Sequence, residues 1–302
     1  MRTKIFSSLF AVMTLFFVSC SDDEGNGGNP QGTGTLSVQM TDAPFPYELI
    51  AEANVTVYKV EARRVSEDDD DDALTTSPYI TLMEEEIETN LLELTNGLTL
   101  QLAEIEVPVG TYDQVRVYVK GVNVVLTDGT VYELKVPSGD SSGIKVFIDP
   151  GITVVGGLSS DLLLDFDVSR SFVAKGNIST AAEISGFNFK PVIKASNLST
   201  AGTLSGNVST VEEETQIGLF GAQVSVFAAD TLNTTSFTDP DGNYAILGLE
   251  AGTYEVVSEF DGFIASDTIE VQINAANVTT QDFILEVDPD AATEEETTEG
   301  GN

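Results

Sequence analysis

Short stretches in which apolar and polar residues alternate recur along most of the chain, and this pattern constrains the fold more than any other feature. Clear examples are residues 36–40, 55–60 and 131–136. Because successive side chains of a β-strand point to opposite faces, a period of two predicts half-buried strands. Thr, Val and Gly are frequent, Trp is absent, and no stretch has a convincing helical period. The sequence therefore predicts an all-β protein.

Turn sequences separate these stretches. Asn96-Gly97 lies between residues 87–94 and 98–107, and Asp128-Gly129 precedes residues 131–136. Asn-Gly and Asp-Gly favour the tight turns that join antiparallel strands. We therefore expect a β-hairpin at each of these two places.

The distribution of charge divides the chain near residue 195. The 302 residues include 13 basic and 49 acidic ones, a net charge of -36, and every Lys and Arg lies at or before Lys194. Roughly nine strands with turn signals predict one β-sandwich over residues 34–195, and a second is expected over 202–287. The acidic, Thr- and Gly-rich residues 288–302 are expected to be a disordered tail. Such a charge repels nucleic acid, so no nucleic-acid partner is expected.

The chain lacks the residue types that many active sites require. It has no histidine, which excludes a Ser-His-Asp triad, a Cys-His dyad and any His-ligated zinc or iron site. Its single cysteine, Cys20, excludes an intrachain disulfide and a Cys-rich metal site. We therefore expect a protein without a cofactor that is not an enzyme.

The first residues have the features of a bacterial lipoprotein precursor. Arg2 and Lys4 precede an apolar stretch, so residues 1–19 are expected to be a secretory signal peptide. The segment that ends at Cys20 resembles a lipobox, which implies acylation of this cysteine with several chains, palmitate among them. The next residues resemble the export signal of Bacteroidota surface lipoproteins: Ser21, Asp22, Asp23 and Glu24.

These resemblances imply a lipid anchor in the outer membrane and exposure on the cell surface. An ordinary acidic linker is the alternative for the residues after Cys20. Residues 20–33 are acidic and then rich in Gly and Asn, so they are expected to be a flexible tether. The membrane is thus an expected partner, reached through the anchor.

Several motifs of the first domain together resemble one known family. They are Leu36-Ser37-Val38, Thr41-Asp42-Ala43-Pro44, Leu91-Leu92-Glu93-Leu94, Gly110-Thr111-Tyr112, Val136-Pro137-Ser138-Gly139, Gly143-Ile144-Lys145, Leu164-Asp165-Phe166-Asp167 and Lys190-Pro191-Val192-Ile193. This set is similar to the domain-of-unknown-function family 4382. The resemblance implies a secreted or cell-surface lipoprotein and supplies no established activity.

The second domain resembles the carboxypeptidase regulatory-like domain, a transthyretin-like sandwich of seven strands. The matching motifs are Gly206-Asn207-Val208, Gly221-Ala222-Gln223-Val224, Thr238-Asp239-Pro240-Asp241-Gly242-Asn243-Tyr244 and Gly252-Thr253-Tyr254. The resemblance implies a structural or binding module. Relatives of this fold include starch-binding modules, which makes carbohydrate binding an expectation by analogy of fold. The fold expected for the chain is two tandem immunoglobulin-like or transthyretin-like sandwiches.

Three aspartates of the first domain are candidate functional groups. Asp165 and Asp167 lie two residues apart, hence on one face of a strand. They are expected to form ion pairs or cap a turn, with Lys145, Arg170 and Lys190 as the possible partners; the alternative is a glycosidase acid and base. Asp42 is expected to close a local Asx-type turn.

Two acidic loops are candidate calcium sites. Asp68, Asp70 and Asp72 belong to a run of six acids, which favours a solvated loop, and clustered carboxylates also suit Ca²⁺. Asp239 and Asp241 alternate like calcium ligands, but Gly242 is misplaced for a calcium loop, so a turn is favoured. No metal is therefore assigned. Two short motifs resemble O-glycosylation sites of the same bacterial group, centred on Thr231 and Thr268.

A Gly-Thr-Tyr motif occurs once in each domain, ending at Tyr112 and at Tyr254. We predict that each tyrosine hydroxyl binds backbone upstream, as in a tyrosine corner. Taken together, the sequence favours a non-catalytic surface lipoprotein that presents two sandwiches for glycan binding or adhesion, with glycans or a surface or transport protein as partners. The alternatives are a carboxylate-based glycoside hydrolase and a calcium-dependent structural or adhesion module.

Overall fold

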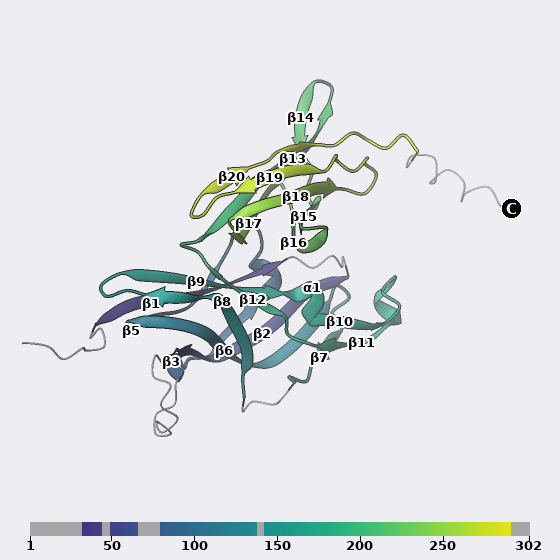
Figure 1. Ribbon diagram of the computed structural model, residues 1–302. Coiled ribbons are helices and arrows are strands. Elements are labelled where there is room, and N and C mark those ends of the chain that lie inside the picture. Colours follow the sequence, from purple (N-terminus) through teal and green to yellow (C-terminus); the bar gives the residue numbers. More distant parts are fainter. Residues whose placement is uncertain (1–31, 44–48, 66–78, 138–141, 291–302) are drawn as a thin grey trace, which may run out of the picture. The chain divides into compact units, whose positions relative to one another are not determined.

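The computed structural model describes residues 32–43, 49–65, 79–137 and 142–290 (Figure 1). Residues Gly32–Asn302 form one compact unit. Strands dominate the described residues, whose α-helix is the single turn α1 (Val168–Ser171). The all-β prediction is therefore confirmed.

The first sandwich contains a four-stranded sheet in the order β12-β9-β1-β5. Its strands are β1 (Thr33–Ala43), β5 (Leu100–Pro108), β9 (Ser159–Asp167) and β12 (Ile193–Asn197). β1 and β9 run parallel, whereas the pairs β1–β5 and β9–β12 are antiparallel. The carboxyl ends of β1 and β9 therefore lie at the same edge, and this places the candidate site described below.

The second sheet of this sandwich has the order β3-β2-β6-β7, with β4 paired to β2 and β8 paired to β6. Its strands are β2 (Ile50–Arg64), β3 (Tyr79–Met83), β4 (Ile87–Asn90), β6 (Gly110–Leu126), β7 (Val131–Glu133) and β8 (Ile144–Val154). A separate two-stranded sheet is formed by β10 (Phe172–Gly176) and β11 (Ile184–Phe189). Two short 3-10 helices are η1 (Leu91–Glu93) and η3 (Ala181–Glu183).

The core lies between the two larger sheets and is built by alternation along each strand. On β6, Val115, Val117 and Val119 belong to the core cluster. Fully burying each such side chain contributes about 1.5–3 kcal/mol. Phe166 and Phe172 both contact the ring of Phe189, with centroids 6.2 and 5.1 Å away.

One of the two predicted hairpins is wrong and the other is confirmed. Asn96 and Gly97 adopt positive φ values of 59° and 79°, so the tight turn forms as expected. However, β4 before it pairs with β2, and β5 after it pairs with β1 in the other sheet. The turn thus carries the chain between the sheets, because each strand buries its apolar face by joining a different layer. The hairpin β6–β7 around Asp128-Gly129 forms as predicted.

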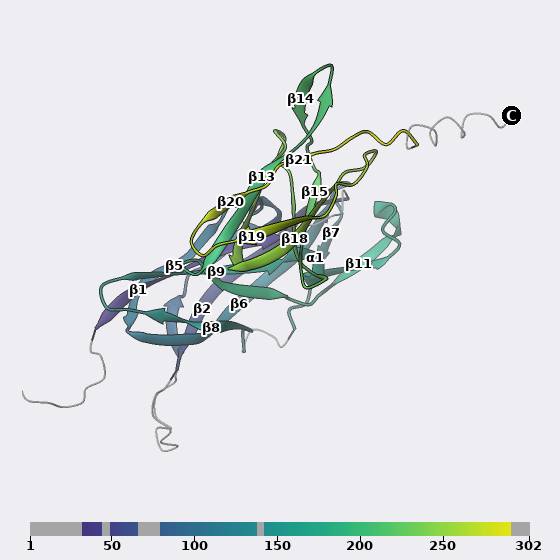
Figure 2. The same ribbon diagram turned by 45° about the horizontal axis from the view of Figure 1, so that its top comes forward.

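The second sandwich consists of the sheet β14-β13-β17, in which β20 and β21 also pair with β13, and the sheet β16-β15-β18-β19 (Figure 2). Its strands are β13 (Ala201–Glu212), β14 (Thr215–Gly218), β15 (Gln223–Ala228), β16 (Thr231–Phe237), β17 (Asn243–Glu250), β18 (Gly252–Glu259), β19 (Ile269–Ile273), β20 (Val278–Thr280) and β21 (Phe283–Ile284). A separate core cluster fills the space between these sheets. Tyr244 and Tyr254 are buried in it, and Phe260 and Phe263 pack against it.

Both Gly-Thr-Tyr motifs form the predicted tyrosine corner. The Tyr112 hydroxyl donates to the Pro108 carbonyl at 2.8 Å, and the Tyr254 hydroxyl donates to the Glu250 carbonyl at 3.0 Å. Each acceptor lies four residues upstream. The described part of the chain contains no helix of the length and apolarity needed to cross a membrane.

Candidate functional site

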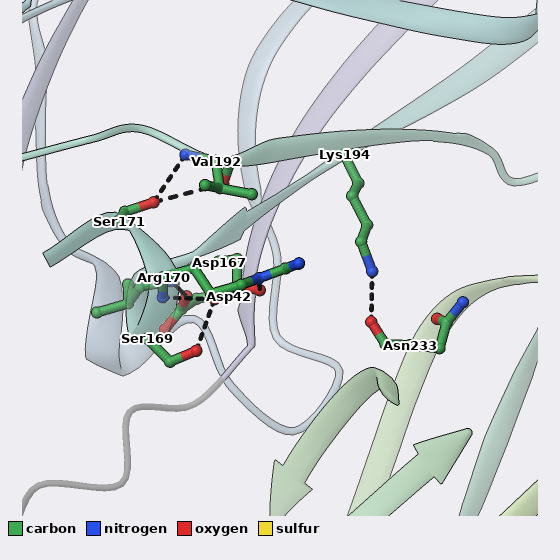
Figure 3. Close-up of polar contacts among 9 residues, drawn as sticks. Asp42, Asp167, Ser169, Arg170, Ser171, Val192, Lys194 and Asn233 are labelled. Atoms are coloured by element: carbon green, nitrogen blue, oxygen red, sulfur yellow. Dashed lines mark hydrogen bonds and ion pairs between the residues drawn. The ribbon is translucent and has the colours of Figure 1, made fainter. Parts of the chain in front are cut away.

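Three sequence motifs that are far apart in the chain meet at one edge of the sheet β12-β9-β1-β5. Thr41 pairs with Asp165 in the parallel register of β1 and β9, and Lys194 of β12 pairs with Asp165 from the other side. Asp42 and Asp167 lie at the carboxyl ends of β1 and β9. This edge therefore gathers three aspartates and a lysine. Asp42, Asp167 and Lys194 are drawn in Figure 3.

Asp167 holds the turn that follows β9. Its Oδ1 accepts hydrogen bonds from the Arg170 amide at 2.9 Å and from the Ser169 hydroxyl at 2.7 Å. Its Oδ2 forms an ion pair with Arg170 Nε at 2.6 Å, and the carboxylate side chain is only 10% exposed. The predicted role in ion pairing and capping is confirmed, with Arg170 as the partner. Lys145, in contrast, lies on β8 of the other sheet.

Asp42 does not form the local turn that was expected. Its Oδ1 accepts from the Val168 amide at 3.1 Å, 126 residues away along the chain. The residue is 5% exposed, and its Oδ2 has no hydrogen-bond partner among the residues that the structure describes. The Asx-turn prediction is wrong because the parallel pairing of β1 with β9 brings the start of α1 within reach of this carboxylate.

Burial raises the pKa of the Asp42 carboxyl well above its usual range. The hydrogen bond from Val168 opposes this shift, whereas the nearby carboxylates of Asp165 and Asp167 add to it. A buried charge is costly when its hydrogen-bonding capacity is only half used. The neutral, protonated form of Asp42 is therefore favoured over a wider pH range than for an exposed aspartate.

Lys194 was missed by the sequence reasoning. Its ammonium donates to the Asn233 carbonyl on β16 (Figure 3). Burial lowers the pKa of Lys194, Asp165 and Asp167 counteract that shift, and Arg170 adds to it. The available signal was the lysine directly after the motif Lys190-Pro191-Val192-Ile193, but its place opposite Asp165 is set by strand register alone.

The space at this edge is too small for a sugar. A cavity of about 20 Å³ is lined by Thr41, Asp42 and Asp165 together with residues of β16 and β17. Such a volume holds about one water molecule. Glycosidase carboxylates flank a substrate with roughly 5–9.5 Å between them in an accessible site. Asp167 is buried, and both of its carboxylate oxygens already bind Arg170 or Ser169. The Asp165–Asp167 pair therefore has a structural role and does not act as a glycosidase acid and base.

A larger cavity of about 200 Å³ is lined by residues of β8, β12 and the ends of β13 and β17, among them Asp149, Ser196 and Glu250. Ligand pockets usually measure about 300–1,000 Å³. This cavity gives no support to a catalytic centre.

The Asp239 loop is a turn, as predicted. Asp239 Oδ1 accepts from the backbone amides of Asp241 and Asn243 at 3.0 and 2.8 Å. Within the described ranges, no group of three or more His, Cys, Asp or Glu residues is arranged to hold a metal ion. Asp68, Asp70 and Asp72 lie outside the described residues.

The remaining candidates concern modification and targeting. Thr231 and Thr268 are both exposed, which is the accessibility that glycosylation requires. Cys20, the residues 21–24 and the tail 288–302 fall wholly or mainly outside the described part of the chain. Those expectations stay predictions.

Comparisons with known proteins agree with both resemblances. A family model described as a domain of unknown function (DUF4382) matches residues 33–191, which is 159 of the 302 residues. A model described as a carboxypeptidase regulatory-like domain matches residues 203–286. No curated protein matches the chain.

Solved structures include two pilins with a distant similarity. The minor pilin GBS52 from Streptococcus agalactiae is 14% identical, with 84% of this chain and 96% of the pilin covered and a TM-score of 0.27. The shaft pilin SpaA from Lactobacillus rhamnosus GG is 12% identical, with 85% and 98% covered and a TM-score of 0.27. Similarity this low carries no information about function. The family match, in contrast, covers more than half of the sequence, and the chain belongs to the DUF4382 family, with a carboxypeptidase regulatory-like domain following in the same chain.

Proposed function

We propose that this protein is a non-catalytic lipoprotein, anchored through Cys20 in the outer membrane, that presents two β-sandwiches outside the cell to bind a glycan or an adhesion partner. The observation that carries the proposal is the engagement of Asp167. This carboxylate, the best candidate for acid–base chemistry, is buried against Arg170 and the turn α1. A display role needs a rigid scaffold, and that is what these contacts provide.

The lipid anchor and the location at the cell surface are inferred from the sequence. The lipobox-like segment that ends at Cys20 supports acylation of this cysteine. The segment Ser21–Glu24, with three acidic residues, supports export to the outer leaflet. Exposed threonines at positions 231 and 268 suit a protein that is glycosylated outside the cytoplasm. None of these features requires a catalytic site.

The proposal is tested in cells that express the full chain. Cells grown with an alkyne fatty acid should label the wild-type protein, and Cys20→Ala should abolish the label. Protease added to intact cells should degrade the wild-type protein, whereas replacement of residues 21–24 by alanine should protect it. Labelling that survives Cys20→Ala, or protection of the wild type, would refute the anchor or the orientation.

The enzymatic alternative is tested on the same protein. The wild-type protein should not hydrolyse glycosides. Asp165→Asn and Asp167→Asn should therefore show the same absence of glycoside hydrolysis. Asp167→Asn should instead lower the melting temperature, since it weakens the ion pair with Arg170. Hydrolysis that disappears in either variant would overturn the non-catalytic assignment.

A further inference from the structure

The outer face of the sheet β3-β2-β6-β8 concentrates positive charge and aromatic rings in a chain of net charge -36. On β6, residues 116, 118 and 120 alternate with the core valines and so point away from the core. On β8, residues 145 and 147 alternate in the same way with Val146 and Ile148. We call the following set the cationic face: Lys59, Arg63, Arg116, Lys120, Lys145, Tyr58, Tyr79, Tyr118 and Phe147.

Strand register places these side chains in rows across the sheet. Arg116 is opposite Glu61 of β2 on one side and opposite Lys145 of β8 on the other. In the next row, Gln114 is opposite Arg63 on one side and Phe147 on the other. Side chains opposite each other in adjacent strands lie about 5 Å apart at Cβ, so each row forms a continuous surface. The strands β2, β3, β6 and β8 that carry it can be followed in Figure 1.

Three of the five cations are paired within the protein. Lys59 Nζ lies 2.7 Å from Glu61, Arg63 Nε lies 2.8 Å from Asp113, and Lys120 is paired with Glu86. Arg116 and Lys145 form no ion pair with any described residue. Like charges placed directly opposite each other destabilise a sheet. An external anion that bound both would remove this repulsion.

Aromatic rings hold the cations in place and extend the surface. The Arg116 guanidinium lies over the Tyr79 ring at 3.9 Å from its centroid, and Lys59 lies over Tyr118 at 5.5 Å. These contacts order the cationic side chains before a ligand binds. The side chains therefore lose little conformational entropy on binding. Phe147, beside this row on β8, is 65% exposed. An exposed ring close to Arg116 and Lys145 offers an apolar surface and positive charge to the same ligand.

We propose that the cationic face binds an acidic polysaccharide, with Arg116 and Lys145 holding carboxylates of uronic acid units and Phe147 contacting a sugar ring. This inference rests on the proposed function and names the class of glycan. The planar guanidinium of Arg116 suits bidentate binding of a carboxylate, and Lys145 adds a second donor across the strand pair.

The charge of the whole chain selects among polyanions. Charges more than about 8 Å apart are largely screened at physiological ionic strength, so the face acts at short range although the protein is acidic. A nucleic acid carries about one phosphate charge per 1.7 Å of duplex. The acidic surroundings of the cationic face would repel so dense a negative charge. A polyuronate carries only one charge per sugar unit, so the acidic surroundings repel it less than they repel a nucleic acid.

The test is affinity electrophoresis and calorimetry of the full mature lipoprotein in detergent micelles, with polygalacturonate as the probe. Dextran is the neutral polymer, and a single-stranded oligodeoxynucleotide is the competing polyanion. Lys145→Gln should weaken polygalacturonate binding about tenfold, and Phe147→Ala about threefold to tenfold. The matched control is Lys175→Gln, which removes an exposed lysine from β10 and should change nothing.

Unchanged melting temperatures of Lys145→Gln and Phe147→Ala would show that the loss concerns binding and not folding. Equal affinity for dextran, tighter binding of the oligonucleotide, equal effects of Lys145→Gln and Lys175→Gln, or absence of binding would each overturn the inference. Surface labelling and acylation report separately on the proposed function. If the protein is a surface-exposed lipoprotein that does not bind polygalacturonate, only this inference is refuted and the proposed function stands.

Discussion

The tyrosine corner of the first sandwich permits a sharp test of how its hydroxyl contributes to stability. Tyr112→Phe removes one oxygen and leaves the ring in place. Tyr112 is 0% exposed, and its hydroxyl donates to the Pro108 carbonyl at 2.8 Å. A neutral hydrogen bond contributes about 0.5–1.5 kcal/mol net, and an acceptor left without a partner in a buried position costs about 1–3 kcal/mol. We expect Tyr112→Phe to lower the free energy of unfolding by about 1–2 kcal/mol.

The matched variant is Tyr254→Phe in the second sandwich. Its hydrogen bond to Glu250 is 3.0 Å long and the residue is 7% exposed, so water can reach part of the site. The loss should be about 0.5–1 kcal/mol, smaller than for Tyr112→Phe. Urea unfolding measures both values, and the dependence on urea concentration should not change because neither variant alters the surface exposed on unfolding.

High pH supplies a second readout of the same hydroxyls. Burial raises the pKa of Tyr112 and of Tyr254. The folded state therefore retains these protons more tightly than the unfolded state, and stability is lost as pH rises from about 10 through the folded pKa. Each Phe variant should flatten that loss. A Tyr112→Phe protein with wild-type stability at neutral pH, or with an unchanged alkaline decline, would refute the reasoning.

The other predictions concern a charge and a turn. Asp42→Asn retains an acceptor for Val168 and removes a buried carboxylate whose pKa is raised by burial. Since the wild type loses stability as pH rises from about 4 through that raised pKa, the variant should melt higher at pH 7 and no higher at pH 3; an equal difference at both would contradict this. Gly242→Ala should cost more than about 2 kcal/mol, because φ is +81° and the new Cβ would lie 2.5 Å from the Val208 carbonyl oxygen. Gly221→Ala, at φ +79° with open space around it, should cost only about 1–2 kcal/mol, and equal losses in the two alanine variants by urea unfolding would exclude the steric clash as the cause.

The alternation along the chain determined the strands because the two faces of a strand meet different environments. Residues 36–40, 55–60 and 131–133 could all be assigned from this pattern, and the Asp128-Gly129 hairpin from turn chemistry. The tyrosine corners were predictable for the same reason, since the hydroxyl reaches an acceptor only four residues away. Local interactions of this kind depend on residues that are close in the chain, so they can be predicted from the sequence.

Only the tertiary structure decided which strands pair. The Asn96-Gly97 turn has the backbone of a hairpin, yet β4 and β5 join different sheets because burial of both apolar faces requires it. The same choice runs β1 parallel to β9, which gives Asp42 a partner at Val168. The antiparallel pairing of β12 with β9 sets Lys194 opposite Asp165. Pairing between segments more than 100 residues apart depends on the packing of the whole sandwich. The sequence alone thus determined the strands and the turns, while register and layer decided where their charged side chains meet.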